Sequence, residues 1–315
     1  MGIVAVSQQH DLEVRQGLQD LIDSFLISQD IGEGSRRTYG RNLKQFTVWI
    51  QQHGQEEPGR QTILQFKKDL EAQGLSPYTI NSYMVTVRRF YAWAETEGYY
   101  RDITRGIKGV KRAKGFKKDP LTVRQIKDLL ASIDRDSLEG KRDYALLNLL
   151  IRTGLRTIEV TRADFGDIRQ QGGEAVLWIQ GKGRTSKDEF VLLTPETLNP
   201  INTYLNARGR VKDNEPLFAS LSDRNQGGRL TTRSISRIAK QHLVDIGLDN
   251  GRLTAHSLRH TAITLSLLGG ATIQEAQTLA RHADVNTTLI YSHNINRLAQ
   301  APERKIDALL AEQTE

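Results

Sequence analysis

The chain has 315 residues, of which 38% are hydrophobic and 26% charged, with a formal net charge of +7. This length predicts two domains, and the lack of any apolar run near about eighteen residues predicts no membrane-spanning helix. The absence of cysteine excludes disulfides and thiolate chemistry and fits a reducing cytoplasm. No basic region followed by a long apolar segment opens the chain, so we expect no signal peptide. The excess positive charge favours a polyanionic partner, with nucleic acid the leading candidate.

The first part of the chain shows apolar residues at helical spacing in four segments, as Leu43, Phe46 and Ile50 do in the second. Ser76 and Pro77 are expected to cap and open the fourth helix. Because the connections between the segments are short, residues 16–104 are predicted to form a small helical bundle. Residues 1–15 form an N-terminal extension to it.

Polar and basic residues cluster near the helix starts of this predicted bundle. A solvated helix face is one interpretation of each residue taken alone. As a set, they indicate a bundle that lays helix N-termini against DNA. The expected DNA contacts are Arg37, Arg41, Thr79, Asn81, Arg88 and Arg89.

Residues 105–118 are rich in lysine, arginine and glycine and contain no acidic residue. Their composition predicts a linker between two domains, although a solvated basic loop is the alternative. A linker this basic would be drawn to phosphates if the domains straddled a duplex. Lys111, Arg112 and Lys114 are the contacts we expect from it.

The remaining residues, 119–315, are predicted to form a second domain that is mainly helical with a small antiparallel sheet, so the chain as a whole is of the α+β class. Two strands, 174–180 and 188–193, flank the polar turn GKGRTSK. A last short helix is expected over 302–310. The other predicted helices cover 121–133, 141–155, 194–208, 231–247, 254–270 and 273–283.

Two polar clusters lie early in the second domain. In RTGLRTIEV, Arg156 follows a buried helix and is either paired, with Glu159, or aimed into a site. In GKGRTSK, glycines flank Lys182 and would let the backbone approach a ligand, so this lysine could reach a phosphate or a leaving oxygen. An ordinary hairpin turn is the alternative for the second cluster.

The HSLRH motif places His256 and Arg259 three residues apart, on one helix face. A histidine beside a guanidinium suits a phosphoryl group. His260 is also on this face, so half of a zinc motif is present. The glutamate of such a motif is replaced by Ser257 and no cysteine is available, so we predict no metal.

The segment ARHADVNTTLIY contains His282 and, nine residues later, Tyr291. A tyrosine hydroxyl has a pKa near about 10 and needs nearby cations and a proton acceptor to react. Alone, Tyr291 is read more simply as a core aromatic. Together, the clusters supply what phosphoryl transfer to a protein hydroxyl needs without a metal.

The order of these motifs resembles that of the tyrosine recombinases, the family of lambda-type integrases, Cre and the Xer proteins. TGLRTIE, GKG, HSLRH and LARHADVNTTLIY match its catalytic boxes, and the N-terminal half looks like its core-binding domain. The family usually has glycine before the last histidine, where this chain has Arg281. The resemblance implies a catalytic set of Arg156, Lys182, His256, Arg259, His282 and Tyr291.

Roles follow from the same resemblance. Tyr291 would attack the scissile phosphorus and form a 3′-phosphotyrosine, without ATP, metal or other cofactor. Arg156 and Arg259 would stabilise the phosphate oxygens, Lys182 would protonate the 5′ oxygen, and His256 would move the tyrosine proton. His282 would donate a hydrogen bond to the phosphate. Further DNA contacts are expected at Thr232, Arg233, Arg237 and Lys240.

The implied function is site-specific recombination of double-stranded DNA through a Holliday junction. Four copies would act together, from a monomer or dimer before synapsis, with the tail helix Pro302–Leu310 docking on a neighbour or on its own domain. An accessory protein and a cytoplasmic, nucleoid-associated location fit this activity. Competing interpretations are a type IB topoisomerase and a DNA-binding regulator with a decayed site. Target sequence, and a choice between Xer-like resolvase and mobile-element integrase, do not follow from the sequence.

Overall fold

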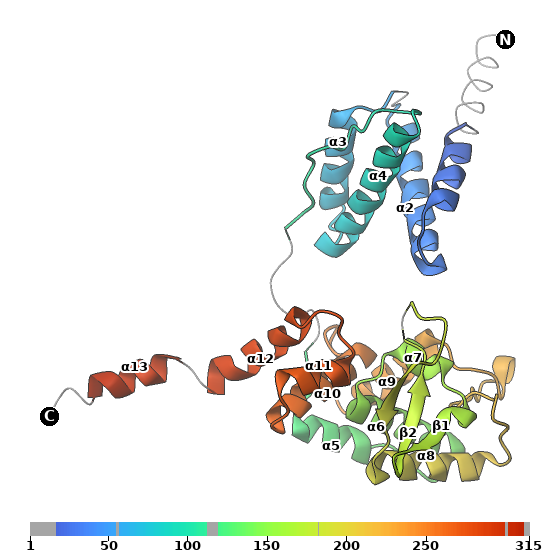
Figure 1. Ribbon diagram of the computed structural model, residues 1–315, viewed down its shortest axis with the longest axis vertical. Helices are drawn as coiled ribbons and strands as arrows, with labels where there is room; N and C mark the ends of the chain where they lie inside the picture. Colours follow the sequence, from blue (N-terminus) through green and yellow to red (C-terminus); the bar gives the residue numbers. More distant parts are fainter. Residues whose placement is uncertain (1–16, 55–56, 112–118, 182, 300–301, 312–315) are drawn as a thin grey trace. The chain divides into compact units, whose positions relative to one another are not determined.

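The computed structural model describes residues 17–54, 57–111, 119–181, 183–299 and 302–311. They form two compact units, one made of described residues up to 111 and the other of described residues from 119 onward (Figure 1). Most residues are helical and there is one small antiparallel sheet, which confirms the predicted fold class. Among the helices described, none is both long and apolar enough to cross a bilayer.

The first unit is a four-helix bundle made of residues 17–28, α2 (Glu33–Gln52), α3 (Arg60–Ala72) and α4 (Pro77–Thr96). Its core is aromatic: the rings of Phe46 and Phe66 lie 4.9 Å apart, and Phe25 meets Phe90 edge-on at 5.6 Å. Such pairs add specific geometry to the burial of apolar surface. The predicted start of α4 is confirmed, since the Ser76 hydroxyl accepts the Thr79 N–H at 3.2 Å.

Residues 103–110 belong to this bundle rather than to the basic linker predicted from residue 105. Ile103 and Ile107 are buried in its core. The Asn81 side chain donates to the Val110 carbonyl and accepts the Val110 N–H, both at 2.9 Å. Asn81 is only 7% exposed, so the residue predicted to touch DNA instead holds this segment in place.

The second unit is built around α6 (Leu138–Thr153), which is buried along most of its length and packs against α8 (Pro195–Arg208) and α10 (Ala255–Leu268). A three-stranded antiparallel sheet runs in the order β1 (Ile168–Gln171), β2 (Glu174–Ile179), β3 (Glu189–Leu192). The remaining helices are α5 (Val123–Ala131), α7 (Thr157–Arg162), α9 (Thr232–Asp245), α11 (Ile273–Ala280), α12 (Asn286–Ala299) and α13 (Pro302–Ala311), with 3-10 turns at Phe165–Asp167 and Asp223–Asn225.

Two helix ends position the polar clusters. Gly154 ends α6 in the left-handed region, at φ 61°, and the chain turns at once into α7. Arg281 ends α11 in the same conformation, at φ 51°. Since α10 packs against both α11 and α12, side chains far apart in sequence meet here.

Candidate active site

Arg259 lies at the centre of the site, on α10, and is 3% exposed. Its guanidinium donates to the carbonyls of Gly154 and Ala280, which end α6 and α11. Burial, and then the charges of Arg156 and Arg281, lower the pKa of Arg259 to about 10. It therefore stays cationic at neutral pH while its two bonds tie together the segments that carry the other site residues.

Arg156 precedes α7 and is both paired and accessible. Its Nη1 donates to Glu159 Oε1 and its backbone N–H to Glu159 Oε2, each at 2.8 Å. Glu159 is fully buried, whereas the Arg156 side chain is 29% exposed. The sequence left open whether Arg156 is paired with Glu159 or aimed into a site. Both hold, because the ion pair with Glu159 fixes a guanidinium that still faces solvent.

Tyr291 is buried on α12, at 4% exposure, with its hydroxyl 2.5 Å from His260 Nδ1. Burial raises the pKa of Tyr291 to about 12, although Arg259 and Arg156 act to lower it. The phenol is therefore protonated at neutral pH in this structure.

The three histidines around the tyrosine differ in exposure. His256 is exposed, and its ring meets the buried His260 ring edge-on, with centroids 4.6 Å apart. His282 Nδ1 lies 2.9 Å from Thr288 Oγ1, and its ring stacks on Tyr291 at 6.3 Å. Proton transfer from the tyrosine is expected at His256, and the structure adds His260, whose Nδ1 contacts the hydroxyl. The sequence already indicated that His260 could lie in the site, since it shares a helix face with His256.

Zinc was the alternative for this histidine pair. Within the described ranges, no group of three or more His, Asp or Glu side chains is placed to hold a metal ion. The pair therefore has no third protein ligand among these residues.

His260, which is buried, and His282, which is partly buried, predict a pH-dependent stability. Burial first, and then neighbouring charges, lower the pKa values of His260 and His282 from 6.5 to about 4. Between these values the unfolded chain binds protons that the folded chain does not, so the free energy of unfolding should fall as pH drops from about 6.5 to about 4. Thermal unfolding at pH 7.5 and 5.0 measures this. A His260→Gln variant should show a smaller pH dependence, and an unchanged one would refute the assignment.

The predicted lysine, Lys182, lies outside the described residues. On the same β2–β3 connection, Lys187 donates to the carboxylates of Asp164 and Asp167, at 2.6 and 2.5 Å. Burial opposes its charge, but these bonds raise the pKa of Lys187 overall. It is therefore an anchor for the hairpin and is poorly suited to donate a proton.

The predicted DNA contacts divide by exposure. Arg112 and Lys114 lie outside the described residues, Asn81 is buried, and the Lys240 ammonium pairs with Asp249 at 2.9 Å. Thr232 and Arg88 are partly buried. The exposed ones are Arg37, Arg41, Thr79, Arg89, Lys111, Arg233 and Arg237.

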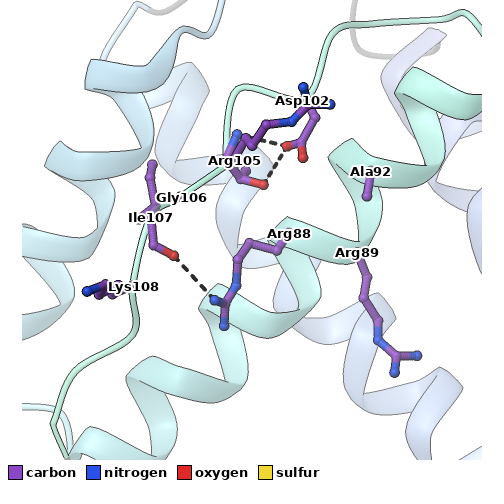
Figure 2. Close-up of a pocket in the computed structure, with 9 residues that line it drawn as sticks. Arg88, Arg89, Ala92, Asp102, Arg105, Gly106, Ile107 and Lys108 are labelled. Carbon is purple, nitrogen blue, oxygen red and sulfur yellow. Dashed lines mark hydrogen bonds between the residues drawn. The ribbon is translucent and has the colours of Figure 1, made fainter.

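A basic hollow of about 510 Å³ lies beside α4 in the first unit and is lined by Arg88, Arg89, Arg105 and Lys108, with one carboxylate, Asp102 (Figure 2). Arg88 donates to the carbonyl of Ile107 at 3.3 Å, and Figure 2 shows Arg89 extending in a different direction. Arg105 is paired with Glu95 at 2.6 Å. Arg89 and Lys108 are therefore the cations of this hollow that are best placed to meet an anion.

Comparison with known proteins gives matches over most of the chain. Residues 120–297 match the phage integrase family and residues 19–98 match the phage integrase N-terminal SAM-like domain. A tyrosine recombinase of Synechocystis, slr0733, is 30% identical over 295 residues, covering 88% of this chain and 92% of its own. Tyrosine recombinase XerD of Caulobacter vibrioides is 30% identical over 284 residues, covering 86% of this chain and 90% of its own.

Solved structures share the fold at lower identity. The XerH recombinase bound to palindromic difH substrate, in a post-cleavage complex, has a TM-score of 0.69 at 22% identity and covers 86% of this chain and 81% of its own. A lambda integrase dimer bound to a COC′ core site has a TM-score of 0.68 at 16% identity. The match covers 88% of this chain and 94% of the lambda integrase chain.

Proposed function

This chain belongs to the phage integrase family and is a site-specific tyrosine recombinase, and on that basis we propose that Tyr291 is its nucleophile. The observation that carries the proposal is the Tyr291 hydroxyl, 2.5 Å from a neutral histidine and within the field of Arg156 and Arg259. Those are the proton acceptor and the cations that a weak tyrosine nucleophile needs.

The reaction balances without an outside energy source. The Tyr291 oxygen attacks the scissile phosphorus, the bond from phosphorus to the 5′ oxygen breaks, and a 3′-phosphotyrosine forms. The tyrosine proton passes to a base and the leaving 5′ oxygen gains a proton. Rejoining is the reverse attack by a 5′ hydroxyl of the partner duplex, so the phosphodiester energy is kept and no ATP is consumed.

The site residues take distinct roles in this step. Arg156 and Arg259 stabilise the charge that develops on the phosphate oxygens. His260 Nδ1, 2.5 Å from the hydroxyl, is an acceptor for the tyrosine proton, and the exposed His256 contacts the phosphate region one turn earlier on α10. His282 donates a hydrogen bond to a non-bridging oxygen. Lys182 remains our proposal for the general acid at the 5′ oxygen.

The substrate is double-stranded DNA carrying a recombination site, which fits the DNA-bound complexes of XerH and lambda integrase. We place its phosphates against the exposed cations of the first unit, with Arg89 and Lys108 in the hollow beside α4. Arg233 and Arg237, exposed on α9, supply contacts from the second unit. Since these contacts are mainly to phosphates, affinity should fall steeply with salt.

Exchange between two duplexes requires four active sites, so we propose a homo-tetramer that forms at synapsis from monomers or dimers and passes through a Holliday junction. Ile306, Leu309 and Leu310 on α13 are 55%, 64% and 64% exposed, a face suited to docking on a neighbouring protomer. The XerD relative favours a Xer-like resolvase over a mobile-element integrase. We also propose that the recombinase acts in the cytoplasm, at the nucleoid, together with an accessory protein.

The test is recombination between two marked target sites, combined with trapping on a nicked suicide substrate. We expect strand exchange in the presence of EDTA, and a covalent adduct that peptide mapping assigns to Tyr291. Relaxation of supercoiled DNA without exchange would instead identify a type IB topoisomerase activity. DNA binding without any adduct would identify a regulator.

A further inference from the structure

Arg281 occupies a backbone conformation that suits glycine. At φ 51° and ψ 48° it is the one non-glycine residue with positive φ within the described ranges. A left-handed conformation costs free energy for any residue with a Cβ, and glycine avoids that cost. The side chain must therefore contribute something that offsets the strain.

The side chain of Arg281 turns back into the protein and is 8% exposed. Its Nη2 donates to Glu159 Oε2 at 3.0 Å and to the Gly154 carbonyl at 3.2 Å, and its Nη1 donates to the Leu279 carbonyl at 2.8 Å. Nε is buried with no acceptor among the described residues. Three hydrogen bonds therefore fix the position of the Arg281 side chain, although its Nε donor makes none within the described part of the chain.

These bonds close a network that contains both phosphate-binding arginines. Glu159 accepts from Arg156 at one oxygen and from Arg281 at the other. The Gly154 carbonyl accepts from Arg281 and from Arg259. The Arg281 carbonyl in turn accepts from Arg156 Nη2 at 3.3 Å. One buried carboxylate thus serves two guanidiniums, those of Arg156 and Arg281, and the Gly154 carbonyl connects Arg281 to Arg259. Arg281 therefore joins the end of α11 to the orientation of Arg156.

We propose that Arg281 is a positioning residue for the cleavage step, acting through Glu159 to hold the Arg156 guanidinium in its orientation toward the phosphate. The proposal rests on the proposed function of Arg156 and Arg259. It predicts a loss in the rate of the chemical step and little change in affinity for DNA, since the buried Arg281 side chain contacts protein groups.

Arg281→Gly tests this, because glycine keeps the left-handed turn while the whole side chain, including the guanidinium, is removed. With a nicked suicide substrate at saturating concentration, we expect adduct formation about 10- to 100-fold slower, as for other small misplacements in active sites. The dissociation constant for DNA should stay within about 3-fold of wild type, well below a tenfold change. Arg281→Lys keeps the charge without the planar fork and should cleave at an intermediate rate.

The matched control is Arg208→Gln, which removes another arginine–glutamate pair of this unit, at 3.1 Å and outside the site. It should cleave at the wild-type rate. If Arg281 acts through Glu159, the Glu159→Gln/Arg281→Gly double variant should be no slower than the slower single variant. Additive losses would overturn the proposal.

The remaining outcomes separate this proposal from the proposed function. A wild-type protein that forms no adduct at Tyr291 would refute the function itself. A wild-type protein that cleaves, beside an Arg281→Gly variant that cleaves equally fast or loses DNA affinity instead, would refute only the positioning role. If Arg281→Gly does not fold, the rate of Arg281→Lys decides, and a rate equal to wild type refutes the role.

Discussion

Tyr291→Phe should abolish the covalent protein–DNA adduct, with a loss of at least about 10⁴-fold in cleavage, because the substitution removes only the attacking oxygen. The fold should persist, since the lost hydrogen bond to His260 is worth about 0.5–1.5 kcal/mol net. Because the fold persists, DNA binding should be retained. Denaturing gels of the reaction on a nicked suicide substrate measure the adduct, and gel shifts measure binding.

Tyr204→Phe is the matched control for this experiment. It removes another buried tyrosine hydroxyl of the second unit, one that accepts the Ala219 N–H at 3.1 Å outside the site. We expect a similar small loss of stability with full adduct formation. An adduct that persists in Tyr291→Phe would mean that a different side chain attacks, and the arrangement around His260 would then be structural.

The sequence predicted those parts of the fold that depend on interactions between residues close together in the chain. The apolar periodicity of the first unit located its four helices, and the cap at Ser76 appeared as expected. β1 was missed because IRQQ is short, polar and exposed, and so carries no alternating pattern. No helix was predicted over α12, because its first residues, NTT, favour turns.

The parts that escaped prediction depend on contacts between distant residues. Asn81 looked like an exposed polar residue near a helix start, but its partner Val110 lies 29 positions away. Arg281 and Glu159 are 122 positions apart, so a buried pair could not be read from either segment. A charged residue in a sequence indicates exposure by default, and only the fold shows which charges are buried.

The second large effect is expected at Arg259, because this residue combines a structural role with the catalytic role that we propose for it. Its guanidinium donates to the carbonyls of Gly154 and Ala280, and it has more N–H groups than these two bonds use, which leaves donors for the phosphate in our proposal. Arg259→Gln removes the cation and should slow cleavage by about 10³-fold or more, the scale seen when an arginine that stabilises a phosphoryl transition state is lost. Single-turnover cleavage on the suicide substrate measures this.

Arg259→Lys separates the two roles. An ammonium keeps the charge but cannot reproduce the planar fork that spans both carbonyls, so we expect a smaller loss, about 10²-fold, together with lower thermal stability. Arg142→Lys is the control, since Arg142 is another buried arginine of this unit, paired with Asp143 at 2.7 Å, and its loss should lower stability alone. If lysine and glutamine at position 259 slow cleavage equally, holding the α6 and α11 ends would be the main contribution of Arg259, and charge stabilisation would fall chiefly to Arg156.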